Sequence, residues 1–345
     1  MGARQVLAER ITAQGLSGEP ARDPVAVAER LLAVQGQDPR GARLAVRSRS
    51  TGLTAADVDR ALTENRSLLI TWLNRGTLHL VRSEDYPLLQ ALTTPPLLTS
   101  CRRRLGQEGV SEAMAERALA TIERALADDG PQTREQLRDR LNSAGLRTEG
   151  QALIHLFFLA AIKGLLVRGP MIGKQHAYVL VRKWLGPQPA IDRDAALAEL
   201  ARRYLVGHGP ADDRDLARWA GLPLRDSRAG LDAIASELDQ RADGLVDLVG
   251  RPPAEPLPPP RLLGAFDPLL LGWTSREEII GPHKYLVTDN GIFRPFALVD
   301  GRAVAVWGLA KGKVEIKPLG KVTKKAGAAL ERDAREVERY MAAGA

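Results

Sequence analysis

The sequence has a single cysteine, few aromatic residues and no long uninterrupted hydrophobic segment. Cys101 is the one cysteine among 345 residues, so a chain can form neither a disulfide framework nor a cysteine-based zinc site. Residues 1–15 mix Arg, Gln and Glu with aliphatic residues, a pattern unlike a signal peptide. No apolar segment approaches the ~18 residues needed to cross a bilayer. These absences predict a cytoplasmic protein in a reducing compartment.

Histidine is also scarce, and its spacing argues against a metal site. The five histidines are widely scattered, and none is paired with another histidine or a carboxylate at a spacing known for zinc ligands. The sequence contains no P-loop and no dinucleotide-binding fingerprint. We therefore expect no metal and no cofactor.

The composition predicts folded domains with a basic surface. The length is more than one small core needs and favours two or three domains, and 44% of the residues are hydrophobic. Lys and Arg together number 49 against 42 Asp and Glu, which favours a polyanionic partner. Charge alone also fits, less well, an ordinary basic protein, or an adaptor that binds protein or RNA through its C-terminal tail.

A polar turn at residues 34–41, Val-Gln-Gly-Gln-Asp-Pro-Arg-Gly, separates two expected helices. Apolar residues at near-helical spacing predict a first helix from Pro24 to about Val34, ended by the glycine and proline of the turn. If residues 41–50 are helical, arginines three and four residues apart share one face, which would suit phosphates. These arginines are Arg40, Arg43 and Arg47.

A pattern of helices followed by a strand pair occurs three times, which predicts tandem winged-helix units. In the first unit, Ser67–Leu73 and Thr77–Val81 should form a hairpin around a turn with a glycine at positive φ. In the third unit, Asp212 or Asp213 should cap a helix, and Leu224–Leu238 should form the next helix, with the strand-rich tail in place of a wing. The expected units are 1–100, 101–190 and 191–345, the last with a proline-rich connector at 251–260.

Several segments together resemble the bacterial AlkZ-like DNA glycosylases, a family built from tandem winged helices that includes self-resistance enzymes of antibiotic producers. Gln35-Gly36-Gln37 matches the Gln-x-Gln signature, although the family usually has an aliphatic residue at the middle position. Gly36 should make the turn more flexible. Four further segments look like family landmarks: Arg75–Val81, His208–Pro210, Asp267–Leu271 and Asn290–Pro295.

The resemblance implies an α+β fold of tandem winged helices with a β-rich C-terminal part, forming a C-shaped DNA-binding scaffold. It also implies a monofunctional DNA glycosylase that hydrolyses the N-glycosidic bond of N7-alkylguanine and leaves an abasic site. Bulky natural-product adducts are the expected lesions, with interstrand crosslinks as a further candidate. The expected partner is double-stranded DNA carrying alkylated guanine, bound by a monomer associated with the nucleoid.

Gln35 and Gln37 are the catalytic candidates that the resemblance implies, although glutamines in surface turns usually touch no substrate. An N7-alkylated guanine is already cationic and leaves as a neutral purine, so it needs little general acid catalysis. Amide groups can orient a water molecule and face an oxocarbenium-like centre with carbonyl dipoles.

Two further residues are candidates for a supporting role at the site. Asp38 should cap the following helix, or alternatively activate the water. His79 alternates with Leu78 and Leu80 and so points to the opposite sheet face. A structural role and lesion contact are both open for this histidine.

Seven basic residues are candidates for DNA binding, although solvated lysines and turn arginines are ordinary surface features. A non-catalytic winged-helix transcriptional regulator is the main alternative, in which helices read a groove and the glutamines are spectators. The seven residues are Arg40, Arg43, Arg47, Arg75, Lys174, Lys311 and Lys313.

Overall fold

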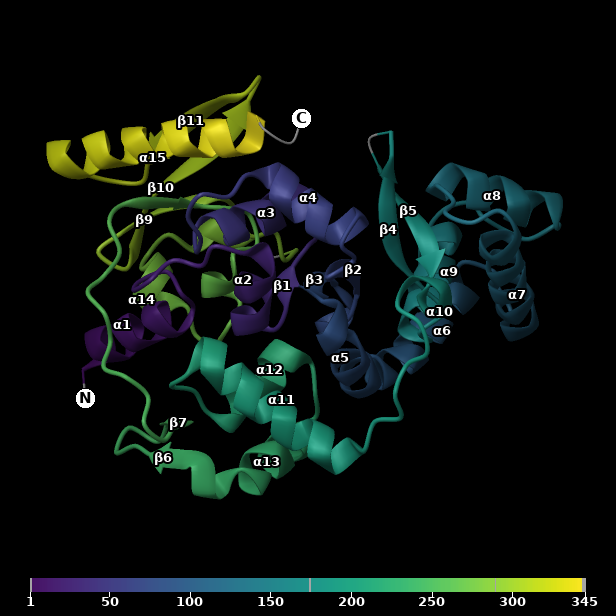
Figure 1. Cartoon of the computed structure of the whole chain (residues 1–345), viewed down its shortest axis with the longest axis horizontal. Coiled ribbons are helices and arrows are strands. Elements are labelled where there is room, and N and C mark those ends of the chain that lie inside the picture. The colour runs from purple at the N-terminus through teal and green to yellow at the C-terminus, as the bar shows by residue number, and fades with distance from the viewer. Residues whose placement is uncertain (1, 174, 289, 343–345) are drawn as a thin grey trace. The chain divides into compact units, whose positions relative to one another are not determined.

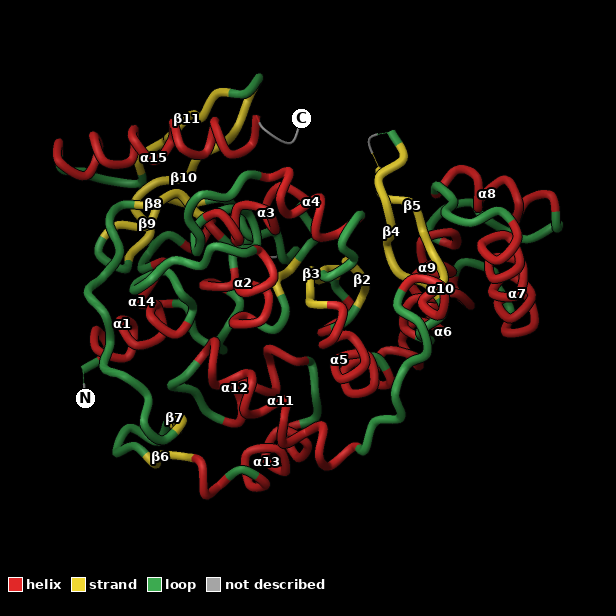
Figure 2. The backbone as a smooth tube through the Cα atoms, viewed as in Figure 1, coloured by secondary structure: helices red, strands yellow, loops and turns green. Residues whose placement is uncertain are grey.

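The computed structural model describes residues 2–173, 175–288 and 290–342 (Figure 1). Helices and antiparallel strands alternate along the chain (Figure 2), so the expected α+β class is confirmed. Two compact units are present: Met1–Asp59 with Asp194–Ala345, and Arg60–Arg193. The expected division at 1–100, 101–190 and 191–345 concerns repeated motifs, whereas these units are defined by packing, so that division remains a proposal.

The N-terminal part of the first unit contains short helices around the glutamine turn. Its elements are α1 (Ala3–Ala13), α2 (Pro24–Leu31), β1 (Val34–Gln35), α3 (Pro39–Arg47) and the start of α4 (Ala55–Thr63). Asp23 caps α2, whose first residue is a proline. At α4, Asp57 accepts bonds from the backbone and hydroxyl of Thr54, as the Thr-x-x-Asp pattern predicts.

The second unit contains a complete winged-helix motif, formed by three helices, α7, α8 and α9, and the strand pair β4–β5. The elements of the whole unit are β2 (Leu68–Trp72), β3 (Leu78–Arg82), α5 (Tyr86–Thr93), α6 (Leu98–Gln107), α7 (Glu112–Asp128), α8 (Arg134–Ser143), α9 (Ala152–Ile162), β4 (Leu166–Ile172), β5 (Gln175–Leu180) and α10 (Val181–Trp184). β2 pairs with β3 and β4, and β4 with β5. Gln132, between α7 and α8, pairs with Tyr178 of β5. A capping box between Thr133 and Gln136 begins α8.

A second motif in which three helices are followed by a strand pair lies in the first unit. It comprises α11 (Arg193–His208), α12 (Asp213–Ala220), α13 (Leu224–Ala233), β6 (Leu238–Gln240) and β7 (Val246–Leu248). Asp212 caps α12, and Gly221 ends it in the left-handed conformation. Ala211 pairs with Val246 of β7, as Gln132 pairs with Tyr178.

The expectation that the tail replaces the third wing was wrong. The helix ends at Ala233, and β6 and β7 form the hairpin themselves. The reason is a turn that the sequence analysis overlooked: Gly244 has φ +80°, and the Asp243 carboxylate accepts from the backbone N–H of Leu245.

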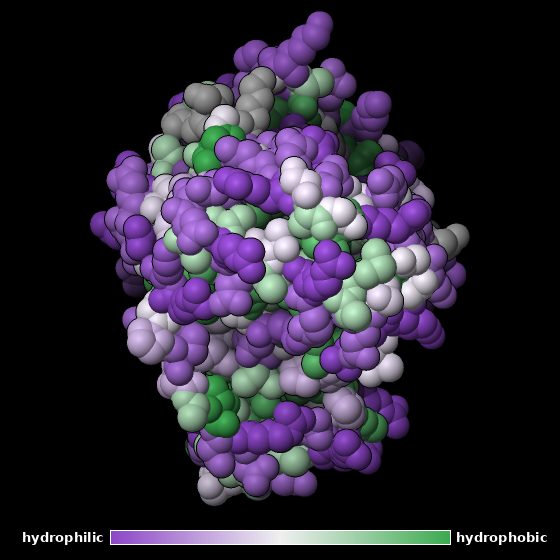
Figure 3. All heavy atoms as spheres, turned by 90° about the vertical axis from the view of Figure 1, so that its right-hand side faces the viewer, coloured by the Kyte–Doolittle hydropathy of each residue, from purple (hydrophilic) through white to green (hydrophobic). Residues whose placement is uncertain are grey.

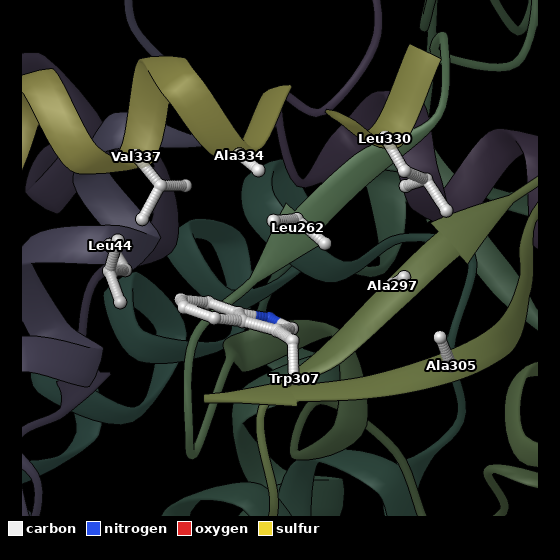
Figure 4. Packing of buried hydrophobic residues seen from close by; sticks show 8 residues of the cluster. All are labelled: Leu44, Leu262, Ala297, Ala305, Trp307, Leu330, Ala334 and Val337. Atoms are coloured by element: carbon white, nitrogen blue, oxygen red, sulfur yellow. The ribbon is translucent and has the colours of Figure 1, made fainter. Parts of the chain in front are cut away.

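The tail forms a four-stranded sheet covered by the C-terminal helix. Its elements are β8 (Arg261–Leu263), α14 (Glu277–Ile280), β9 (Phe296–Val299), β10 (Arg302–Ala310), β11 (Lys313–Pro318) and α15 (Lys324–Ala342), with sheet order β11-β10-β9-β8. Trp307 packs beneath α15, and Leu44 of α3 joins the same core (Figure 4). Helix α3, which follows the glutamine turn, is therefore anchored in the core of the tail.

Hydrophilic residues cover most of the face shown in Figure 3, and hydrophobic residues form small separate groups there. Among the described residues, no helix is both long and apolar enough to cross a membrane.

Candidate active site

The glutamine turn begins earlier than the sequence pattern predicts. Helix α2 ends at Leu31 and not near Val34, because Leu32 has φ 61° and ψ −44°. The N–H of Ala33 donates to the carbonyl of Leu31 at 2.7 Å, which makes Leu32 the centre of a γ-turn with positive φ, a strained conformation. The chain then enters β1, which carries Gln35.

The two glutamines lie in different environments. Gln35 is buried, with 6% of its surface exposed, whereas Gln37 is exposed. Asp38 is the N-cap of α3: one carboxylate oxygen accepts from Arg40 N at 2.8 Å and from Gly41 N at 3.2 Å. The structure therefore shows the capping role expected of Asp38.

Two close backbone contacts hold the chain on either side of this turn. Upstream, Gly207 of α11 lies against the end of α2: an added Cβ there would lie 2.2 Å from the carbonyl oxygen of Arg30. Downstream, a Cβ on Gly41 would lie 2.3 Å from the carbonyl oxygen of Ala265, next to Gly264. Real Cβ atoms do not approach so closely, so only glycine permits these contacts.

A buried ion pair fixes the chain just beyond α3. Arg49 Nη2 lies 2.8 Å from Asp267 Oδ1, and both side chains are almost completely buried. The same guanidinium donates to the backbone carbonyl and the side chain of Gln14. Sequence reasoning missed Arg49, although Asp267 begins one of the family landmarks.

The three arginines of α3 do not form one free basic face. Arg43 pairs with Asp59 of α4 and donates to the carbonyl of Pro39. Arg47 donates to both carboxylate oxygens of Asp333 on α15. Arg40 is exposed. Arg43 and Arg47 thus join α3 to neighbouring helices, and Arg40 remains at the surface.

The two lysines of the β10–β11 hairpin lie at its tip and are exposed. Lys311 has φ 50° in the turn, and Lys313 Nζ lies 3.0 Å from Glu338 of α15. Lys317, Lys321, Lys324 and Lys325 follow along the chain and are also exposed. The first unit therefore carries a lysine-rich segment from the hairpin tip to the start of α15.

Arg75 and His79 belong to the second unit, and Lys174 lies outside the described residues. Arg75 has φ 58° in the turn between β2 and β3, next to Gly76 at φ 74°, so the expected positive φ of that glycine is confirmed. His79 is buried, and its Nδ1 lies 2.9 Å from the carbonyl oxygen of Thr77. Burial, and then the positive charge of Arg75, lower the pKa of His79 to about 3.

Within residues 2–173, 175–288 and 290–342, no cluster of three or more His, Cys, Asp or Glu side chains is suited to a metal ion. The turn itself offers the amides of Gln35 and Gln37, the exposed guanidinium of Arg40 and the helix-capping carboxylate of Asp38. Each of the two units contains a winged-helix motif, an α+β arrangement that is common among nucleic-acid-binding proteins.

Comparisons with known proteins identify the class. The family model described as DNA glycosylase AlkZ-like matches residues 28–340. A Streptomyces sahachiroi protein named interstrand DNA cross-link repair glycosylase is 28% identical, over 97% of this chain and 95% of that protein. The structure of Streptomyces sahachiroi DNA glycosylase AlkZ is similar with a TM-score of 0.79 and 26% identity, covering 99% of this chain and 96% of that one.

The chain belongs to the AlkZ-like DNA glycosylase family. The resemblance inferred from its short motifs is confirmed, and the protein is a DNA glycosylase, an enzyme of DNA repair that acts on DNA.

Proposed function

We propose that the protein hydrolyses the N-glycosidic bond of N7-alkylguanine in double-stranded DNA, including bulky adducts and interstrand crosslinks, and leaves an abasic site. The relative named for interstrand cross-link repair supports this substrate class. The observation that carries the proposal is the Gln-Gly-Gln turn between α2 and α3. The one carboxylate of this turn, that of Asp38, caps α3.

The chemistry of the lesion suits such a turn. The glycosidic electron pair leaves with a purine that is already cationic, so the base becomes neutral without an added proton. The enzyme then has to stabilise an electron-poor sugar and position water, and amide dipoles do both without a titratable group. We assign orientation and electrostatic stabilisation to Gln35 and Gln37, and expect slow reaction on unmodified DNA.

For DNA binding we propose the exposed residues Arg40, Lys311 and Lys313, together with Arg75 and Lys174. Exposed cations can neutralise phosphates and release counterions. Arg43 and Arg47 are engaged with Asp59 and Asp333, which supports a structural role for them.

The second unit does not support the alternative that the protein is a non-catalytic transcriptional regulator. A winged-helix regulator places its last helix in the major groove and reads base edges with polar side chains. In this unit the corresponding helix, α9, is almost entirely apolar and most of its residues are buried. It therefore presents little to a groove.

The test is base release from duplexes that carry N7-methylguanine or a bulky N7 adduct, comparing wild type with Gln35→Ala and Gln37→Ala. Wild-type excision that both substitutions reduce at least about a hundredfold, with DNA affinity retained, is the expected result. Absence of excision by the wild type from every alkylated duplex would overturn the proposal.

A further inference from the structure

Two aromatic rings and an arginine lie together beside the start of α3 in the first unit. Phe266 follows Ala265, whose carbonyl oxygen packs against Gly41 in the first turn of α3. The ring centroids of Phe266 and Phe293 are 5.7 Å apart, and the guanidinium carbon of Arg276 lies 5.3 Å from the centroid of the Phe293 ring. We call Phe266, Arg276 and Phe293 the arginine–aromatic cluster.

The backbone at Phe266 has an unusual conformation for an aromatic residue. Its φ is 57°, in the left-handed region, where a bulky side chain is a clear outlier. The flanking residues Ala265 and Asp267 are buried, whereas Phe266 is half-buried and reaches the surface. A glycine would adopt this turn without strain. Strained residues of this kind gather at binding sites, and the group that Phe266 offers to a ligand is its ring.

Arg276 has unused hydrogen-bonding capacity at the surface. It is half-buried, and its Nε donates to the carbonyl of Leu270 at 3.3 Å. No carboxylate among the described residues pairs with it, whereas Arg10, which also stacks on an aromatic ring in this unit, is paired with Asp215. Burial, and then the positive charge of Arg218, lower the pKa of Arg276. Its two terminal amino groups match the paired oxygens of a phosphate.

We propose that the arginine–aromatic cluster binds one nucleotide of the DNA substrate, whose base stacks on Phe266 and whose phosphate is bound by Arg276. Every base has a π-face, so an aromatic ring can stack on any of them. Phe293 contacts both side chains and supports them. A base reaches a side chain in this way only when it leaves the duplex stack, so the bound nucleotide is displaced from the helix.

The position of the cluster indicates which nucleotide it binds. The cluster adjoins the first turn of α3, which begins directly after the glutamine turn in the same unit. The nucleotide therefore belongs to the DNA around the lesion. The lesion base is itself cationic, and the guanidinium of Arg276 would repel it, so the bound nucleotide is an undamaged one beside or opposite the lesion. This binding step is separate from the bond cleavage assigned to Gln35 and Gln37.

Fluorescence of 2-aminopurine tests for the displaced base. The duplex contains a tetrahydrofuran abasic analogue, which has no base to release, and 2-aminopurine placed in turn beside and opposite it. Binding of the wild-type protein should raise the fluorescence at one of these positions, because the probe leaves the stack. Phe266→Leu keeps an apolar side chain against Phe293 but has no π-face, so it should abolish the rise and weaken binding about tenfold. Phe266→Tyr should restore both.

The salt dependence of binding to the same duplex tests the phosphate contact. Arg276→Gln should make the slope of log K against log salt less steep by about 0.9, as for the loss of one phosphate contact. Arg202→Gln is the matched control, because Arg202 is a half-buried arginine of the same unit that is paired with Glu199 and Glu237. This control should keep the wild-type slope.

The inference and the proposed function fail separately. Wild-type affinity in Phe266→Leu, equal slopes in Arg276→Gln and Arg202→Gln, or no fluorescence rise at any position would each overturn the inference, whatever the rate of base release. A wild-type protein that gives the expected rise and slopes but releases no base from N7-methylguanine duplexes would overturn the proposed function and leave the nucleotide site standing.

Discussion

Gln35 and Gln37 differ in burial although one residue separates them, and this affects how their substitutions will be interpreted. Gln35 lies in β1 with little exposed surface, whereas Gln37 is exposed. Removing a buried amide disturbs its surroundings as well as the site. We therefore expect Gln35→Ala to lower both stability and activity, and Gln37→Ala to lower activity alone.

Asp38→Asn separates the two roles considered for Asp38. Asparagine caps helices as well as aspartate does, so base release from N7-methylguanine duplexes should remain within about threefold of wild type. Asp38→Ala should reduce the free energy of unfolding by ~1 kcal/mol through loss of the cap. A loss of more than a hundredfold in Asp38→Asn, with unchanged stability, would instead make the carboxylate the water activator.

Two buried histidines make stability depend on pH. Burial lowers the pKa of His79 and of His208 to about 3, whereas an unfolded histidine titrates near ~6.5. Between these values the unfolded state binds more protons, so stability falls as the pH falls, by up to ~1.4 kcal/mol per pH unit for each histidine. Urea unfolding at pH 7, 6 and 5 measures this, and His79→Gln should reduce the slope. An unchanged slope in that variant would contradict the prediction.

At the scale of elements, the close glycine contacts explain how a flexible Gln-Gly-Gln turn can be held in place. Gly207 of α11 and Gly41 of α3 let distant backbone segments touch the chain before and after the turn. Gly230 makes a similar contact elsewhere: an added Cβ would lie 2.5 Å from the carbonyl oxygen of Leu197.

Gly207→Ala should therefore lower the base-release rate at saturating enzyme, because α2 must shift and Gln35 with it. A misplacement of about 1 Å can reduce a rate on the order of a hundredfold. Gly230→Ala should cost similar stability and leave the rate per folded molecule unchanged. The contact would have no positioning role if both variants gave equal rates below their thermal midpoints.

The β10–β11 hairpin should contribute to the salt dependence of DNA binding. Lys311→Gln removes an exposed cation at the hairpin tip, so the slope of log K against log salt should become less steep by about 0.9. Lys163, which is paired with Glu116 in the second unit, gives a matched control as Lys163→Gln. Fluorescence anisotropy with duplex DNA from 50 to 200 mM salt measures both slopes, and equal slopes would argue against contact at the tip.

At the scale of the whole molecule, the proposed reaction requires only protein, DNA and water. Because the lesion carries its own positive charge, departure of the base needs no Lewis acid. We expect base release to be unchanged after dialysis against EDTA and unaffected by later addition of Mg²⁺ or Zn²⁺. Loss of activity on dialysis that one of these ions restores would contradict the expectation of a metal-free reaction.

Local chemistry made much of the fold predictable. The cap at Asp212, the end of α12 at Gly221 and the β2–β3 turn follow from interactions within a few residues. The Asp243-Gly244 turn was equally local, but it was overlooked. Leu32 could not be foreseen, because a buried leucine adopts positive φ only where the surrounding core compensates for the strain.

The sequence by itself determined the class of the protein, because the order of short motifs and the helical and strand periodicities are properties of the chain alone. Only the tertiary structure decided which charges are internal. Arg47 and Asp333, and likewise Arg49 and Asp267, are more than 200 residues apart and become partners through folding. Burial likewise keeps His79 neutral, because desolvation depends on packing and not on neighbours in sequence.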